Sequence, residues 1–211
     1  MKILAIDCAT NFGWATFQQD HTPGYTMRGV QRYGSINVKP REAKDNPLGD
    51  WPESPHQRHF RLFKAVRDLI KGLARVSAEG EVPQRYDYSD LWLVTEGSHG
   101  FSRGGNATKV ANELRGVLGL IVGMYAIPGY LEIAPTTLKK FACGSGGSRK
   151  NPVTKEHMIA AARAKFGYKG RSDDEADALI ILHRALDMGQ DGLTQAMVTQ
   201  QKRTKKKEKA Q

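Results

Sequence analysis

The sequence predicts an α/β protein with one mixed β-sheet covered by helices. Three short strand-like segments near the N-terminus are separated by turns rich in Asn, Gly and Pro, which indicates an antiparallel meander. Later apolar strands alternate with helical segments, as in parallel strand–helix–strand units. We therefore expect a five-stranded sheet, with strands at residues 2–7, 13–18, 32–38, 91–97 and 129–135.

Apolar residues at helical spacing predict the elements that cover this sheet. Phe63, Val66 and Ile70 recur every three or four residues and define one face of the first helix. Ser172 precedes Glu175 by three residues, which is the capping-box pattern of a helix start. The expected helices cover residues 58–76, 106–125, 136–142, 153–166 and 172–186.

Length and charge indicate the domain organisation and the class of partner. The chain has 211 residues, of which 39% are hydrophobic, so it can build one substantial core, which we assign to residues 1–190. The C-terminal segment TQQKRTKKKEKAQ carries six cations, and we expect residues 191–211 to form a basic, disordered tail. The net charge of +10 favours polyanions as partners, nucleic acid more than lipid.

The cysteines and the hydropathy exclude several other classes. Cys8 and Cys143 lie far apart and belong to no CxxC or paired histidine pattern, so we expect reduced thiols and no zinc site. No stretch approaches the roughly 20 apolar residues that a membrane span requires. The sequence therefore predicts a cytoplasmic protein.

Four carboxylates occupy positions that the predicted fold brings to one edge of the sheet. Asp7 and Glu96 each end an apolar strand, and Asp174 and Asp177 lie one turn apart on the last helix. Close carboxylates repel by about 4 kcal/mol per pair at an effective dielectric constant of about 20. Oxygen ligands favour Mg²⁺ or Mn²⁺, and two such ions about 4 Å apart can clamp the attacking water and the leaving oxygen of a phosphodiester.

Structural roles would explain some of these acids taken alone. Asp173, Asp174 and Glu175 lie in the first turn of a helix, where the helix dipole favours acids. Asp7 could cap the turn after its strand. Asp177 is harder to explain in this way, because it lies past the first turn and near apolar residues. Asp173 shares the helix face of Asp177, so spacing alone leaves open whether Asp173 or Asp174 is the ligand.

Several local motifs are similar to those of the RuvC-type Holliday junction resolvases, members of the ribonuclease H-like superfamily. The segments AIDCATNFGWA, VTEG and DDEADAL resemble the motifs that carry catalytic acids, and they select Asp7, Glu96, Asp174 and Asp177. The segments ANELRGVLG and APTTLKKF resemble two further motifs and place Arg115 and Lys139, while Lys155 falls where the family has a second basic residue. After its first acid the chain has Cys-Ala-Thr in place of Pro-Gly-Ser, as divergent phage-type relatives often do.

The resemblance implies a ribonuclease H-like fold and an endonuclease that makes paired nicks in four-way (Holliday) DNA junctions. It implies a homodimer, two Mg²⁺ ions per active site with Mn²⁺ as a substitute, and a bacterial cell or a phage-infected host. Asp7 would bridge the two ions, and the other three acids would complete their coordination. Lys139 and Lys155 would hold a phosphate or stabilise charge in the transition state.

Further residues are candidate contacts to DNA. Phe101 and Arg103, in the loop GSHGFSRGG, would wedge into or stack on unpaired bases, unless they simply cover the site. Arg149 and Lys150 lie in a loop of Gly, Ser and basic residues, which suits either a phosphate contact or a flexible connector. Arg115 is assigned to DNA binding through the resemblance.

Three other classes of protein share part of this pattern. An actin-like ATPase has the same core, but residues 8–12 lack the glycines that cradle phosphates. A DEDD-type exonuclease needs Asp-x-Glu at the first strand, where this chain has Asp7-Cys8-Ala9. A non-catalytic protein that binds branched DNA on the same fold would not require the acids.

Overall fold

Five strands form one mixed sheet in the computed structural model, which describes residues 1–8, 11–19, 29–38, 54–73, 75–76, 86–97, 106–148 and 150–208. The order is β3-β2-β1-β6-β7. The strands β1 (Lys2–Asp7), β2 (Asn11–Gln19) and β3 (Gly29–Asn37) are an antiparallel meander. The strands β6 (Leu91–Glu96) and β7 (Gly129–Ile133) run parallel to β1. The predicted α/β class and five-stranded mixed sheet are confirmed.

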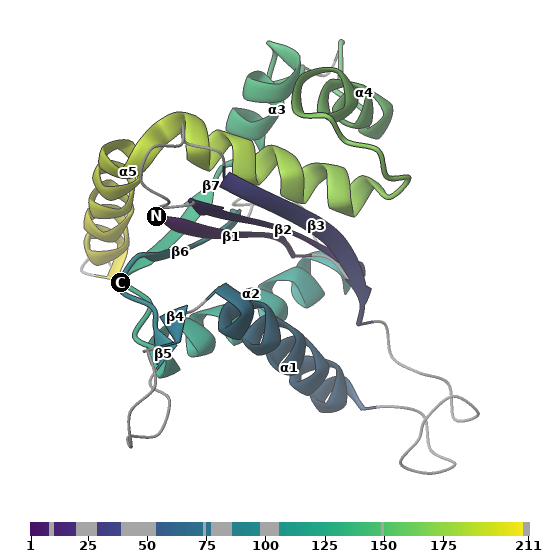
Figure 1. Ribbon diagram of the computed structural model, residues 1–211. Helices are drawn as coiled ribbons and strands as arrows, with labels where there is room; N and C mark the ends of the chain where they lie inside the picture. Colours follow the sequence, from purple (N-terminus) through teal and green to yellow (C-terminus); the bar gives the residue numbers. More distant parts are fainter. Residues whose placement is uncertain are drawn as a thin grey trace.

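Helices cover both faces of this sheet (Figure 1). On one face lie α1 (Pro55–Leu73) and α2 (Asn106–Met124). On the other lie α3 (Pro135–Cys143), α4 (Lys155–Phe166) and the first half of α5 (Asp173–Glu208). Two short strands that the sequence did not predict, β4 (Arg75–Val76) and β5 (Tyr86–Asp87), pair with each other after α1. None of the described helices is long and apolar enough to cross a membrane.

The central strands are apolar throughout because both of their faces are buried. Successive side chains of a strand point to opposite faces, so Ile3 and Ala5 of β1 pack toward α5 while Leu4 and Ile6 pack toward α1 and α2. The first five residues of β1 and of β6 are buried, and only the terminal residue of each strand is partly exposed. Each of these terminal residues is a carboxylate, Asp7 or Glu96.

The helix α5 is longer than the sequence indicated. The expected helix ends at residue 186 and the expected disordered tail begins at residue 191, whereas α5 continues to Glu208 after a kink at Gly189. Gly189 has φ 64° and ψ 178°, a conformation that is essentially restricted to glycine. Leu193, beyond the kink, is fully buried in the core on this face. The predicted boundary of the tail was therefore wrong, since the start of this segment belongs to the folded domain.

Candidate active site

The parallel pairing of β1 and β6 brings two predicted acids to one edge of the sheet. Ile6 is in register with Thr95, so Asp7 and Glu96 lie beside each other at the two strand ends. The Thr95 hydroxyl donates a hydrogen bond of 2.8 Å to the Ile6 carbonyl oxygen and lies 3.3 Å from Cys8 Sγ. These contacts fix the two strand ends relative to each other.

The first turn of α5 lies directly against β2. A Cβ atom on Gly13 would come within 1.8 Å of the Asp174 carbonyl oxygen, so the close approach requires glycine. Asn11 Nδ2 donates a hydrogen bond of 2.6 Å to Asp174 Oδ2, and the Ser172 hydroxyl lies 3.4 Å from the same oxygen. The start of α5 is thereby held at the edge of the sheet where β1 and β6 end.

The acids at this edge repel one another. Burial raises the pKa of Asp7 well above its usual value, and the charges of Asp177, Glu96 and Asp174 raise it further. Burial also raises the pKa of Asp177 to about 7, with contributions from Glu96, Asp173 and Asp174. Among the described residues, Asp177 Oδ1 is buried and has no hydrogen-bond partner. Burial and mutual repulsion therefore disfavour the charged forms of Asp7 and Asp177 as long as no cation is bound.

The donor set at this edge suits a hard divalent cation. Carboxylate oxygens are the ligands that Mg²⁺ and Mn²⁺ prefer, and a bound cation would satisfy the unpartnered oxygen of Asp177. Cys8 does not belong to this set, because burial raises the pKa of its thiol to about 12. In the part of the chain that the structure describes, no three His, Cys, Asp or Glu side chains are already arranged as a metal-binding group. The described acids lie at one edge of the sheet, but their carboxylates do not converge on a single ion position.

Asp173 differs from the neighbouring acids because a lysine neutralises it. Lys155, at the start of α4, forms an ion pair and a hydrogen bond with Asp173 Oδ2. This contact lowers the pKa of Asp173 and raises that of Lys155. Asp174 is instead contacted by the uncharged amide of Asn11. Of the two acids that spacing left open, Asp173 is therefore the one that a lysine of the protein already contacts.

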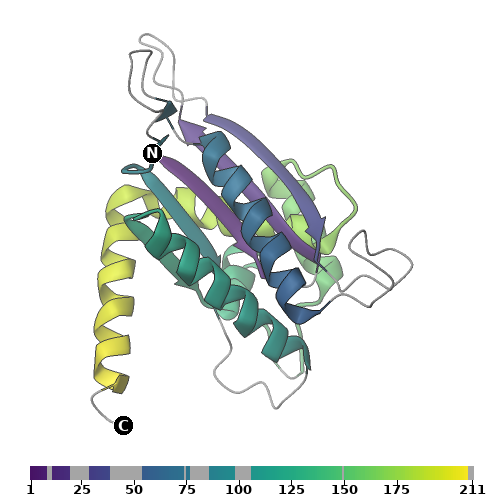
Figure 2. The same ribbon diagram turned by 90° about the horizontal axis from the view of Figure 1, so that it is seen from below.

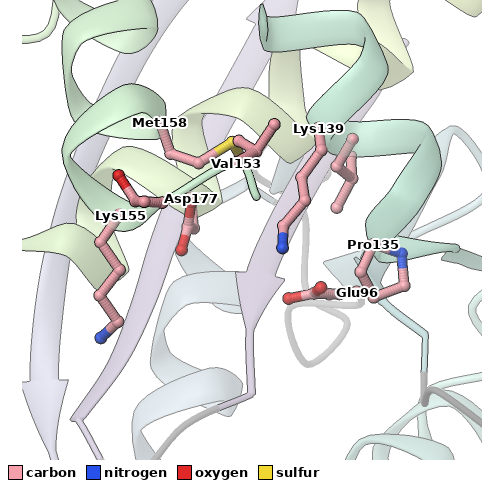
Figure 3. A pocket seen from close by; sticks show the side chains of 9 residues that line it. Glu96, Pro135, Lys139, Val153, Lys155, Met158 and Asp177 are labelled. Carbon is pink, nitrogen blue, oxygen red and sulfur yellow. The ribbon is translucent and has the colours of Figure 1, made fainter. Parts of the chain in front are cut away.

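A pocket of about 190 Å³ opens between the end of β6 and the helices α3, α4 and α5 (Figure 3). Glu96 and Asp177 line it, together with Lys139 of α3 and Lys155 of α4. Figure 3 shows the Lys139 ammonium group pointing toward the Glu96 carboxylate. Pro135 occupies the first position of α3, where proline is favoured, so α3 begins directly after β7 and carries Lys139 to the pocket. The pocket combines carboxylates that attract cations with ammonium groups that attract phosphate.

A hydrogen-bond network that the sequence analysis missed supports the first turn of α5. The sequence predicted that Glu175 closes a capping box, but its carboxylate accepts hydrogen bonds of 3.1 Å from the Ser35 hydroxyl of β3 and from the Tyr168 hydroxyl. The Tyr168 ring packs against Tyr33 of β3, with the ring centres 5.4 Å apart. No local motif signals these partners, because they are distant in sequence.

The candidate DNA contacts are described only in part. Arg115 Nε donates a hydrogen bond of 3.0 Å to the Glu96 carbonyl oxygen, so Arg115 ties α2 to the end of β6. Lys150 is exposed in the turn region between α3 and α4. The remaining candidates lie outside the described residues: Phe101, Arg103 and Arg149. The predicted contacts of all five residues with DNA stay predictions.

Comparison with known proteins identifies the fold. No family model matches the sequence, and no curated protein matches it. The structure of RuvC from Thermus thermophilus has a TM-score of 0.58 and 17% identity, covering 92% of this chain and 98% of that chain. T. thermophilus RuvC in complex with a Holliday junction substrate has a TM-score of 0.55 and 18% identity, covering 86% of this chain and 90% of that chain. The yeast mitochondrial Holliday junction resolvase Ydc2 has a TM-score of 0.45 and 15% identity, covering 85% of this chain and 75% of that chain.

The two likenesses to T. thermophilus RuvC define the class of the protein as α/β with a ribonuclease H-like fold. More particularly, the chain has the fold of T. thermophilus RuvC over nearly its whole length. At 17–18% identity the likeness establishes the fold, and the chemistry has to be argued from the site.

Proposed function

We propose that this chain is a metal-dependent endonuclease that makes paired nicks in four-way DNA junctions or related branched DNA. One observation carries the proposal: buried, mutually repelling carboxylates gather where β1 and β6 end and α5 begins. The fold shared with T. thermophilus RuvC, one structure of which contains a Holliday junction substrate, supports the same function. The net charge of +10 suits a polyanionic substrate.

The four acids would hold two Mg²⁺ ions, for which Mn²⁺ can substitute: Asp7, Glu96, Asp174 and Asp177. When bound, such ions supply the Lewis acidity that activates water and stabilises the leaving oxygen of a phosphodiester. The chain's own residues prepare the site for them. Asn11 orients the Asp174 carboxylate, and Arg115 holds the backbone of Glu96.

Two lysines would hold the phosphate that is cut. Lys139 points into the pocket beside Glu96, where its ammonium group can donate to a phosphate oxygen and offset developing charge. Lys155 lines the same pocket and is paired with Asp173, with 75% of its side chain exposed. Lys155 would therefore act from the rim of the pocket, while Lys139 acts inside it.

We also infer a homodimer, joined through α2. Leu120 and Met124 of α2 are 58% and 60% exposed, which is unusual for large apolar side chains. Gly116 and Gly123 are exposed on the same helix, and no atom lies within 4 Å of the position that a Cβ would take. An apolar stripe interrupted by glycines allows two helices to approach closely. Leu120→Glu with Met124→Glu should convert the dimer to a monomer in sedimentation.

The nuclease proposal is tested with end-labelled four-way junction, replication fork and linear duplex, each in Mg²⁺ and in chelator. We expect symmetric nicks in the junction, in Mg²⁺ only. Asp7→Asn should keep junction binding and abolish nicking. Asp191→Asn, an exposed acid on α5, is the matched control and should nick normally. An Asp7→Asn protein that still cleaves in Mg²⁺ would remove Asp7 from the mechanism.

A non-catalytic protein that binds branched DNA is the alternative. One observation favours it: among the described residues, no three His, Cys, Asp or Glu side chains are arranged as a metal-binding group. Tight junction binding with no nicking in either Mg²⁺ or Mn²⁺ would support this alternative and contradict the nuclease.

A further inference from the structure

A groove of about 690 Å³ lies next to the pocket of the candidate active site. Its lining includes Gly97, which directly follows Glu96, and Thr137, which lies on the same helix as Lys139. From there the groove extends between β7 and the second half of α5, as far as Arg203 and Thr204. The groove and the pocket therefore share the end of β6 and the start of α3.

The kink at Gly189 turns α5 back along the edge of the sheet. Figure 2 shows the second half of α5, in yellow, running from the end of the sheet where β1 begins toward the end where β1 terminates. Gln200 Oε1 accepts a hydrogen bond of 3.0 Å from the backbone N–H of Glu132 in the edge strand β7. The C-terminal half of α5 is thus held along β7, and Arg203 lines the same groove as Gly97, the residue after Glu96.

The lining of the groove is polar along α5, although the Thr199 and Thr204 hydroxyls donate to carbonyl oxygens of α5 itself, so Arg203 is the cation on this half of the helix that faces the groove. The α5 residues that face it recur at helical spacing, and the polar ones are Gln195, Thr199, Gln200, Arg203 and Thr204. Glu132 is the only acid among the described lining residues, and its Oε1 accepts a hydrogen bond of 3.1 Å from the Tyr130 hydroxyl. Arg184 also lines the groove and pairs with Asp187. Outside the groove, exposed cations extend the basic surface, namely Lys202, Lys205 and Lys206.

We propose that this groove and the basic end of α5 hold the sugar–phosphate backbone of a DNA arm as it leaves the active site. The inference rests on the proposed nuclease function and assigns a place to one arm of its substrate. Arginine, lysine, threonine and glutamine are among the side chains that contact phosphate oxygens, and such contacts carry no sequence preference. Each phosphate that a cation neutralises releases bound counterions, so the contact should appear in the salt dependence of binding.

The test compares two double variants that each remove two positive charges. Arg203→Gln with Lys206→Gln changes the proposed contact, and Lys64→Gln with Lys71→Gln changes α1 on the opposite face of the sheet. Binding of a four-way junction is measured in chelator over a range of salt concentrations. The first variant should bind about 10-fold more weakly, with a slope of log K against log salt that is smaller by about 1.8. The control should stay within about 2-fold, with nearly the wild-type slope.

The outcomes separate this inference from the function on which it rests. Arg203→Lys with Lys206→Arg keeps both charges and should restore affinity and slope, which a merely structural effect of the substitutions would not do. The control with Lys64→Gln and Lys71→Gln should nick the junction like wild type, because it alters no residue of the pocket or of the groove. A Gln variant with wild-type affinity and slope would overturn the inference while leaving the nuclease intact. A wild-type protein that neither binds nor nicks the junction would overturn the proposed function itself.

Discussion

The two halves of α5 are held to the protein by different forces. The first half is packed into the core along most of its length, with nearly complete burial of Ala176, Ala178, Leu179, Ile180, Ile181, Leu182 and Ala185. The second half fully buries Leu193 and is tied to the edge strand by the Gln200 side chain. The first half carries two of the four acids of the site, Asp174 and Asp177, while the second carries cations at its C-terminal end. A single helix therefore provides both a rigid support for the candidate metal ligands and a more weakly held basic surface beside them.

Removing a carboxylate from the first half should have the largest effect. Asp177→Asn preserves the shape of the side chain and removes a charge from the cation site, so we expect nicking in Mg²⁺ to fall about 100-fold or more. Asp191→Asn, in the second half of the same helix, should leave the rate unchanged. Single-turnover cleavage of a labelled junction measures both rates. A similar loss in the two variants would show that the charge of α5 matters in general and that Asp177 has no special role.

The same substitution should stabilise the metal-free protein at high pH. The pKa of Asp177 is raised to about 7 by burial and by neighbouring acids, so the native state keeps a proton that the unfolded chain releases near pH 4. The metal-free protein should therefore lose stability as the pH rises from about 4 to about 7. In chelator at pH 8, the free energy of unfolding of Asp177→Asn should exceed that of wild type by about 1–3 kcal/mol, and near pH 4 the difference should vanish. Urea unfolding at the two pH values checks this, and equal stability at pH 8 would contradict the repulsion.

Gly189, between the two halves, tests whether the kink of α5 requires a backbone conformation that only glycine adopts. Gly189 has φ 64° and ψ 178°, so Gly189→Ala should lower the free energy of unfolding by about 1–3 kcal/mol. Gly72→Ala in α1 is the matched control, because no atom lies within 4 Å of its Cβ position and its backbone is helical. The control should gain about 0.5–1 kcal/mol. A Gly189→Ala protein as stable as wild type would mean that the kink needs no special backbone conformation.

The contrast between the two halves also explains what the sequence could predict. The first half of α5, β1 and β6 are apolar runs, whose pattern alone indicates burial, so their boundaries and the carboxylates at their ends could be placed in advance. The second half depends on Gln200 meeting a backbone N–H that is 68 residues away, and Asp174 depends on Asn11, 163 residues away. Polar contacts over such separations leave no periodic signal. The sequence therefore missed them and placed the end of α5 too early.

Substituting Asn11, which contacts the first half of α5, should have a smaller effect on nicking than removing a carboxylate. The Asn11 amide donates to Asp174 Oδ2 at 2.6 Å, so Asn11→Ala leaves that oxygen with only the longer contact of 3.4 Å to the Ser172 hydroxyl. We expect the Mg²⁺ concentration for half-maximal nicking to rise about 10-fold, because groups that orient ligands typically contribute this much to metal affinity. Asn11→Asp also loses the N–H donor but adds a negative charge that attracts the cation, so the same titration should show a smaller rise than in Asn11→Ala. An unchanged Mg²⁺ dependence in Asn11→Ala would show that Asp174 does not need this orientation.

Gln200 should give the smallest effect, because a single hydrogen bond contributes only about 1 kcal/mol net. Gln200→Ala should lower the free energy of unfolding by about 0.5–1 kcal/mol and should speed amide hydrogen exchange at Glu132, whereas the exposed neighbour Gln201→Ala should change neither.

Gln200→Glu then separates the two roles of the second half of α5. The carboxylate still accepts from the Glu132 N–H, so slow exchange should persist, while the added negative charge in the groove should weaken junction binding. Fast exchange in Gln200→Glu would mean that the contact depends on more than the acceptor oxygen. Unchanged junction binding in the same variant would count against a DNA arm in the groove, because a carboxylate beside a phosphate backbone repels it.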